Sequence, residues 1–321
     1  ELGFRPSEIG RSLKTLRTRT LGVVIPSLTN PVFAASVAGM EAEARRRRHT
    51  LLLTATDYDA AREPEVVETL VAQSVAGLVL TVTNAEDNPT LDLLESEGIP
   101  YVLIYNEPKR ADRAAVTVDN EAATFALTRS MIEAGHRRIV YVAGRFATTD
   151  RARTRYQGYL SAMAQAGLAA EPPLELDYLS DIDSHREALA AVFGAPARPT
   201  AALCSNDLLA LSVMGALRSL NIKVPEEGSV AGFDGIALGG AAYPSLATVD
   251  TPTRRMGERA VEKIFEMLED HAPPSVERLP FHLRQGGTLS AAPGPSVDAP
   301  RTRRPDDACP SSSASPKTPS P

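Results

Sequence analysis

The chain has 321 residues, which is enough for two domains of ordinary size, each with its own hydrophobic core. Its net charge is −6, and no apolar run approaches the roughly 20 residues of a membrane-spanning helix. The start of the sequence lacks the basic-then-apolar order of a secretory signal. Cys204 lies in an apolar run and Cys309 in a polar tail, which is not a disulfide framework. We therefore expect a cytoplasmic protein with no membrane partner.

From residue 21 onward, short β-branched runs alternate with longer amphipathic segments. This alternation predicts an α/β fold built from parallel βαβ units, with helices on both faces of each sheet. One doubly wound domain needs only about half this length, so we expect two such sheets. The predicted strands are residues 21–26, 50–55, 77–82, 100–105, 115–118, 138–143, 174–178, 200–204, 230–233 and 275–283. The predicted helices are residues 31–48, 61–74, 89–97, 120–134, 152–166, 185–193, 207–220 and 252–269.

The first 20 residues are basic, with five basic and two acidic side chains, on an otherwise acidic chain. Pro6 and Ser7 can begin a short helix, but a helix of about two turns is marginal in water without a partner. A basic segment of this kind suits an anionic polymer such as DNA, where Leu13 beside Arg11 has the character of a minor-groove wedge. A solvated basic linker is the alternative interpretation.

Four short motifs carry a resemblance to a known family. They are Leu-Gly-Phe-Arg-Pro at 2–6, Ile-Gly-Arg-Ser-Leu at 9–13, Thr-Arg-Thr-Leu-Gly-Val-Val-Ile-Pro at 18–26, and Asn-Pro-Val-Phe at 30–33. Together they resemble the lactose/galactose-repressor (LacI/GalR) family of bacterial transcriptional regulators. The resemblance implies a helix-turn-helix headpiece, a hinge helix and a core of two periplasmic-binding-protein-like lobes joined by three crossovers. Only the end of the headpiece is matched, so we expect most of it to be missing here.

The resemblance also implies partners. Operator DNA would be bound through hinge residues Ser7, Arg11, Ser12, Leu13 and Lys14, given a headpiece in the full-length protein. In the family, the helix matching residues 31–48 lies at a dimer interface, which implies a homodimer. That helix carries small and apolar side chains at Ala35, Val37, Ala38, Met40 and Ala42.

The same resemblance divides the chain into parts. Residues 1–20 are expected to be the headpiece remnant and hinge, residues 21–118 with 251–274 the first lobe, and residues 119–250 with 275–289 the second lobe. The crossings then fall near Asp119, Asp250 and Pro274. Residues 290–321 are rich in proline and serine, a composition that buries too little surface to fold, and are expected to be a disordered tail.

Several polar side chains follow directly after predicted strands, which is where open α/β sheets bind ligands. Asn206 and Asp234 each follow a strand, Arg155 begins the helix after another, and Phe33 lies just past the first. Carboxylates and guanidinium groups can bind neighbouring hydroxyls in pairs, and an aromatic ring packs on a flat face. The simpler alternatives are that Asn206 and Asp207 cap a helix and that Phe33 belongs to the core.

With the resemblance, Phe33, Tyr105, Arg155, Asn206 and Asp234 are expected to bind the effector, while Asp207 is expected to be a structural cap. The implied effector is a hydroxyl-rich small molecule such as a sugar or a nucleoside. Tyr105 stands where many relatives have an aspartate, and residues 145–150 do not match the usual serine-rich loop. The implied function is that of a ligand-responsive regulator, a repressor.

Other classes of function find less support. Residues 235–240 lack the G-x-G-x-x-G spacing, and there is no P-loop and no G-x-S-x-G motif. The five histidines are scattered without metal-ligand spacing, and His136 is expected to be structural. The run Arg45–Arg48 is interpreted as a solvated helix end rather than a nucleic-acid patch. We expect no catalytic residue, metal or cofactor; a transport-type sugar-binding protein of the same fold is the alternative.

Overall fold

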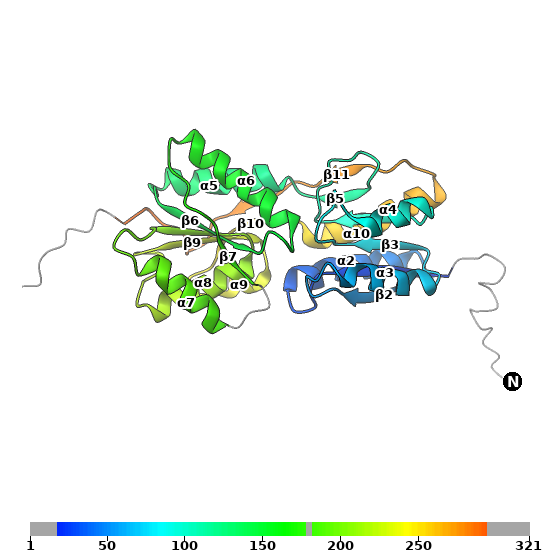
Figure 1. Ribbon diagram of the computed structural model, residues 1–321, viewed down its shortest axis with the longest axis horizontal. Helices are drawn as coiled ribbons and strands as arrows, with labels where there is room; N and C mark the ends of the chain where they lie inside the picture. The colour runs from blue at the N-terminus through cyan, green and yellow to red at the C-terminus, as the bar shows by residue number, and fades with distance from the viewer. Residues whose placement is uncertain (1–17, 178–181, 294–321) are drawn as a thin grey trace, which may run out of the picture.

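The structure, a computed structural model, describes residues 18–177 and 182–293, which form two lobes side by side (Figure 1). Each lobe is built on a six-stranded sheet, and every strand pair is parallel except β10 with β12. The first sheet has the order β11-β5-β4-β3-β1-β2, and the second has the order β12-β10-β9-β8-β6-β7. The predicted fold of two doubly wound lobes is confirmed.

The first lobe contains β1 (Thr20–Ile25), α2 (Pro31–Arg46), β2 (Thr50–Ala55), α3 (Arg62–Ala72), β3 (Gly77–Leu80), α4 (Pro89–Ser96), β4 (Tyr101–Ile104), β5 (Ala115–Thr117), α10 (Thr253–Glu269) and β11 (Val276–Arg278). The second lobe contains α5 (Asn120–Glu133), β6 (Ile139–Gly144), α6 (Asp150–Gln165), β7 (Leu174–Leu176), α7 (Ile182–Phe193), β8 (Ala201–Cys204), α8 (Asp207–Ser219), β9 (Ser229–Asp234), α9 (Ala237–Ala241), β10 (Ala247–Asp250) and β12 (His282–Arg284). The predicted hinge residues and most of the predicted tail lie outside the described residues.

Two features of the second half differ from the prediction. The single strand expected over residues 275–283 is two strands, β11 in the first sheet and β12 in the second. Pro280 lies between them and cannot donate to a sheet ladder, so the pairing breaks there. The third crossing therefore lies between Arg278 and His282 rather than near Pro274, and residues 276–278 belong to the first lobe. Neither α9 nor β10 was predicted.

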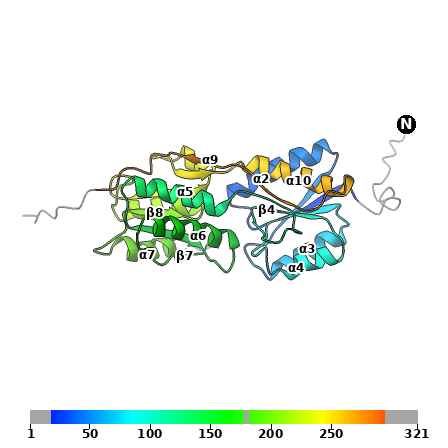
Figure 2. The same cartoon turned by 90° about the horizontal axis from the view of Figure 1, so that it is seen from above.

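Helices cover both faces of each sheet. In the first lobe α2 and α10 lie on one face and α3 and α4 on the other (Figure 2). Helices α2 and α10 cross closely because Gly39 and Gly257 each pack against the backbone of the other helix. A Cβ on Gly257 would lie 2.0 Å from the Ser36 carbonyl oxygen. Met40 is buried in this packing, while Ala35 and Ala38 remain exposed. Met40 is thus a core residue and cannot contribute to a dimer surface.

The end of α2 accounts for the conspicuous arginine run. Arg47 Nε donates to a carboxylate oxygen of the buried Glu43 over 2.7 Å, and its guanidinium lies 4.6 Å from the centre of the Phe265 ring. Arg45 and Arg46 are exposed. The run is therefore a helix end, partly solvated and partly folded back on the lobe.

His136 is structural, as predicted. It lies between α5 and β6, where its ring nitrogens contact the hydroxyls of Thr200 at 2.9 Å and Ser229 at 3.0 Å. Burial lowers the pKa of this imidazole, which keeps it neutral.

Within the described residues, no helix combines the length and apolar character needed to cross a bilayer.

Candidate effector-binding site

The carboxyl ends of strands from both sheets meet where the two lobes face each other. All five predicted effector residues line a single cavity there: Phe33 follows β1, Tyr105 follows β4, Arg155 lies in α6, Asn206 follows β8 and Asp234 ends β9. The cavity has a volume of about 30 Å³. It is also lined by residues that the sequence did not single out, namely Asn30, Val32, Tyr58, Thr149, Arg151 and Ala152.

Two of these residues have backbones in the left-handed region. Tyr105 has a φ of 71° and Asp234 a φ of 117°, conformations that L-residues rarely adopt. The Asp234 carbonyl accepts a hydrogen bond from the Thr251 hydroxyl at 3.0 Å, and the Tyr105 hydroxyl donates to the Val32 carbonyl at 3.1 Å. Strain of this kind concentrates at functional sites, because the surrounding structure must hold it in place.

Phe33 lies edge-on to Tyr105, with ring centres 5.5 Å apart. Phe33 is both core and cavity wall, so the two interpretations of this residue are compatible. Tyr105 therefore presents an aromatic ring to the cavity.

Arg155 is held firmly by protein groups. Its Nε donates to Asn120 Oδ1 at 2.8 Å, and its Nη1 donates to the Ser205 carbonyl at 2.6 Å. The guanidinium stacks on Phe233, 3.5 Å from the ring centre, and lies 3.5 Å from an Asp234 carboxylate oxygen. Burial raises the pKa of Asp234 to about 7, although the Arg155 charge opposes that shift.

The roles of Asn206 and Asp207 differ from the prediction. Asn206 caps α8, because its Oδ1 accepts the Leu209 N–H at 2.8 Å, and it also lines the cavity. Asp207 is structural but not a cap. Its carboxylate accepts the Ile236 N–H at 2.8 Å and the Thr248 hydroxyl at 2.6 Å, which ties α8 to the loop after Asp234. Burial raises the pKa of Asp207 to about 6.

The start of α6 joins the lobes directly. The Asp150 N–H donates to the Thr83 carbonyl at 2.9 Å, and its carboxylate accepts Asn106 Nδ2 at 2.9 Å and the Ala85 N–H at 3.0 Å. Burial raises the pKa of Asp150. Neither this contact nor the role of the neighbouring Arg151 in lining the cavity was predicted from the sequence. The signal was available in the Arg-x-x-x-Arg spacing of Arg151 and Arg155, which places two guanidinium groups on one helix face.

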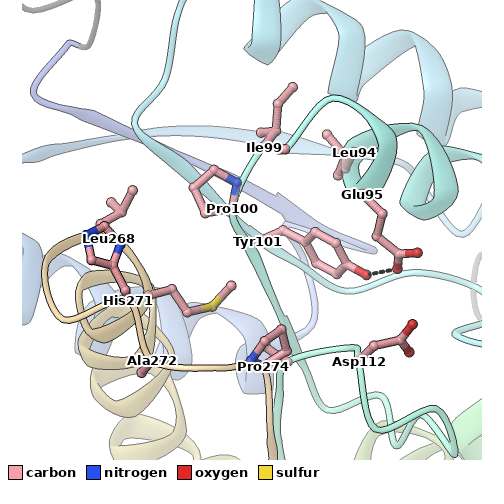
Figure 3. A pocket seen from close by; sticks show the side chains of 13 residues that line it. Leu94, Glu95, Ile99, Pro100, Tyr101, Asp112, Leu268, His271, Ala272 and Pro274 are labelled. Carbon is pink, nitrogen blue, oxygen red and sulfur yellow. Dashed lines mark hydrogen bonds between the residues drawn. The ribbon is translucent and has the colours of Figure 1, made fainter.

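A larger cavity, of about 580 Å³, lies in the first lobe between α4 and the end of α10 (Figure 3). Charged residues beside it form what we call the α4 cluster: Asp92, Glu95, Arg110, Asp112 and Arg113. These charges are paired with one another, with 2.9 Å from Arg113 Nε to Glu95 and 2.7 Å from Arg110 Nη2 to Asp112. The Tyr101 hydroxyl also donates to Glu95 at 2.6 Å, as the dashed line in Figure 3 marks. None of the predicted effector residues lines this cavity.

In the α4 cluster the pKa values of two carboxyl groups, Glu95 and Asp112, are lowered. Burial alone would raise the pKa of Glu95, but hydrogen bonds from Tyr101 and Arg113 and the arginine charges hold it below its usual value. The hydrogen bond from Arg110 lowers the pKa of Asp112.

A third cavity, a groove of about 600 Å³ at the start of α10, shares Val32 and Asp234 with the small cavity. In the part of the chain that the structure describes, no group of three or more His, Cys, Asp or Glu side chains suits a metal ion.

Comparison with known proteins agrees with this architecture. The family model described as periplasmic binding protein-like domain matches residues 128–289. The structure resembles that of a LacI family transcriptional regulator from Silicibacter pomeroyi, with a TM-score of 0.75 and 26% identity, covering 84% of this chain and 98% of the other. The fold is therefore that of the periplasmic-binding-protein-like class.

Two curated relatives narrow the class to a family. The HTH-type transcriptional regulator GntR of Escherichia coli (strain K12) is 31% identical over 299 residues, covering 90% of this chain and 86% of that protein. The ribose operon repressor of Haemophilus influenzae is 28% identical over 270 residues, covering 84% of this chain and 80% of that protein. The chain belongs to the LacI/GalR family of transcriptional regulators, as the motifs at residues 2–33 predicted.

Proposed function

We propose that the chain is a repressor that binds a hydroxyl-rich small molecule, of the sugar or nucleoside type, between its lobes and thereby controls binding of operator DNA. The observation that carries the proposal is the convergence of Phe33, Tyr105, Arg155, Asn206 and Asp234 on one interlobe cavity. Asp234 and Asn206 supply groups that bind hydroxyls, and the two aromatic rings supply an apolar wall.

A direct path leads from the cavity toward the predicted hinge. The Thr18 N–H bonds to the Ser74 carbonyl at the start of the first lobe, and β1 then runs to the cavity, where Asn30 and Phe33 follow it. A ligand that favours one lobe arrangement shifts the population toward it. We propose that this shift moves the hinge segments, with Ser7, Arg11, Ser12, Leu13 and Lys14, into or out of a DNA minor groove.

The hinge mechanism requires two copies of the chain. Besides the exposed Ala35 and Ala38 on α2, the edge strand β2 exposes Leu52 and Leu53, at 38% and 37%. An exposed apolar edge strand is a surface that proteins normally cover, and a second copy would cover it here. A homodimer that acts on operator DNA in the cytoplasm fits these features. The basic first 20 residues and the regulator relatives favour this function over a transport-type sugar-binding protein.

The function is tested with Asp234→Asn. A panel of sugars, sugar derivatives and nucleosides is screened for an increase in the melting temperature of the protein. The compound that stabilises the wild type should lose at least tenfold in affinity for Asp234→Asn, since a charged hydrogen bond is worth about 1.5–3 kcal/mol. The exposed Asp87→Asn is the matched control and should bind normally. The same compound should change how the full-length protein retains DNA fragments selected from a random pool. Equal binding by Asp234→Asn, or DNA retention that no stabilising compound alters, would contradict the function.

A further inference from the structure

The cavity beside the α4 cluster lies at the other end of the first sheet from the effector site. Pro100 and Tyr101 line it at the amino end of β4, and Ala114 lines it just before β5. Tyr105, in contrast, follows the carboxyl end of β4 and lines the interlobe cavity. Among the described residues, the two cavities have no lining residue in common. The volume of about 580 Å³ falls in the range of small-molecule sites, about 300–1,000 Å³, so the cavity is a candidate for a separate binding site.

The walls of this cavity are mostly apolar. Ile99 and Pro100 lie between α4 and β4, and Met267 and Leu268 lie in the last turn of α10. All four are partly exposed, so a ligand that packs on them removes apolar surface from water. The thioether of Met267 adapts its shape and makes favourable contacts with aromatic rings, and Pro100 and Pro274 present rigid faces. These walls suit a flat ring.

The charged groups in the lining act against an ionic ligand. Glu95 and Asp112 line the cavity, whereas the two arginines of the α4 cluster do not. Figure 3 shows both carboxylates on the same side of the cavity, away from Leu268 and His271. An anion would meet these carboxylates. A cation would leave water for groups that hydrogen-bonded arginines already compensate, so it would gain little. An uncharged ligand avoids both costs.

His271 supplies a polar group on the other side of the cavity. Its residue is exposed, and among the described residues its side chain has no hydrogen bond or ion pair. A neutral imidazole carries one donor and one acceptor nitrogen, so it can bind a ligand hydroxyl in either direction. The lining therefore combines an apolar slot with one uncommitted hydrogen-bonding group.

The cavity also lies on the side of the first lobe where the chain enters from the predicted hinge. The Pro100 carbonyl accepts the Leu78 N–H at 3.0 Å, which joins the cavity wall to β3. Just before β3, the Ser74 carbonyl accepts the Thr18 N–H at 3.3 Å and the Thr18 hydroxyl at 2.7 Å. A ligand in the cavity therefore acts close to the hinge without contacting the effector site.

We propose that this cavity is a second, regulatory site that takes an uncharged two-ring aromatic molecule bearing a hydroxyl group. The rings pack against Pro100, Met267 and Pro274, and the hydroxyl binds His271. Binding does not depend on the proposed function, whereas the regulatory role rests on it.

The experiment uses three photo-crosslinking benzophenones that share one ring system and differ in charge. They are the uncharged 4-(hydroxymethyl)benzophenone, the anion 4-benzoylbenzoate and the cation 4-(aminomethyl)benzophenone. Affinity for the whole protein is measured by calorimetry, and the crosslinked peptide is located by mass spectrometry after irradiation. The uncharged compound should bind at least tenfold more tightly than either ion, because it loses no charge hydration. Its crosslink should fall on Met267 or another lining residue, which tests the site without any variant.

Ala272→Phe is the blocking variant, because Ala272 lines the cavity, is partly exposed and gives the new ring room to fill the space. It should keep the wild-type melting temperature and lose at least tenfold in affinity. Ala61→Phe is the matched control, since Ala61 is exposed, belongs to the same lobe and does not line the cavity. It should change affinity less than twofold. His271→Gly suits the positive φ of 52° at this position and should weaken binding about threefold to tenfold through the lost hydrogen bond.

Three results would overturn the site: a crosslink outside the lining, equal affinity in Ala272→Phe, or tighter binding of either ion. Unchanged affinity in His271→Gly would overturn the hydroxyl contact. In the full-length protein, the uncharged compound should also change the retention of selected DNA fragments when no interlobe effector is present. Retention that an interlobe effector alters and this compound does not would overturn the regulatory role and leave the proposed function standing. Retention that neither alters would contradict the proposed function as well.

Discussion

The molecule uses the same residue types in two regions to opposite effect. The α4 cluster and the cleft cluster, which we define as Asp150, Arg151, Arg155, Asp207 and Asp234, each combine aspartate or glutamate with two arginines. In the α4 cluster the pKa values of Glu95 and Asp112 are lowered by hydrogen-bonded arginines. In the cleft cluster burial raises the pKa values of all three carboxyl groups. In the α4 cluster, hydrogen bonds and arginine charges outweigh burial at Glu95 and Asp112, whereas in the cleft cluster burial outweighs the hydrogen bonds and ion pairs that its carboxyl groups make.

This difference is the one expected between a structural cluster and the proposed binding site. Carboxylates and guanidinium groups that satisfy one another gain nothing from a ligand, even beside the larger cavity of Figure 3. Carboxyl groups held out of water at strained backbone positions, such as Asp234, retain binding capacity that a ligand can use.

The largest effect is expected from breaking the α4 cluster at its buried cation. Arg113 is fully buried and donates to Asp92, Glu95 and two backbone carbonyls. Arg113→Met removes the charge and leaves these acceptors without their hydrogen-bond donor, so it should lower the free energy of unfolding by about 3–5 kcal/mol. Urea unfolding measures the loss, and effector affinity of the folded fraction should stay within a factor of two. A loss of effector affinity as large as that in Asp234→Asn would erase the distinction between the clusters.

The sequence predicted most of the fold because its strand signals were strong. Near-continuous apolar runs such as those at β1 and β3 are typical of parallel strands covered on both faces, and both are buried in the structure. The missed elements lie between residues 237 and 250: the five-residue helix α9 has too few residues to show a helical period, and the strand β10 follows it closely. Strands β11 and β12 were merged because Pro280 alone marks the break between them.

The site was predicted from residues that follow strand ends and from the family resemblance, and the structure brings all five predicted residues to one cavity. The contacts between lobes could not be predicted, since they depend on how two separately folded sheets face each other. Asp150 binding Asn106 across the cleft is one example. Arg151 lies one residue before the predicted helix 152–166, and the structure shows that α6 begins at Asp150 and that Arg151 lines the same cavity as Arg155.

The two clusters should also respond to pH with opposite signs. The pKa of Asp234 in the folded state is about 7, above its unfolded value, so its contribution to stability is present below about pH 4 and lost as pH rises toward 7. Asp234→Asn removes this titration. The stability of the variant relative to wild type should therefore increase between about pH 5 and 8, by about 2–3 kcal/mol.

The opposite behaviour is expected of Glu95. Its pKa is lowered on folding, so its contribution is present above its unfolded pKa and is lost as pH falls through the folded value. Glu95→Gln should cost more stability at neutral pH than in acid. Urea unfolding of both variants across the pH range checks the signs, and a shared sign would show that the clusters do not differ in charge compensation.

The smallest effect is expected at the exposed end of the α4 cluster. Arg110 forms ion pairs with Asp112 and Glu95, and Arg113 also forms one with Glu95. The Arg110 side chain is 41% exposed, whereas the Arg113 side chain is buried. Water and salt screen an exposed ion pair, and holding two mobile side chains costs entropy. Arg110→Gln should therefore leave the melting temperature indistinguishable from wild type, at low and at high salt. A drop comparable to that of Arg113→Met would mean that the cluster acts as one cooperative network, whose stability does not depend on which of its charges is buried.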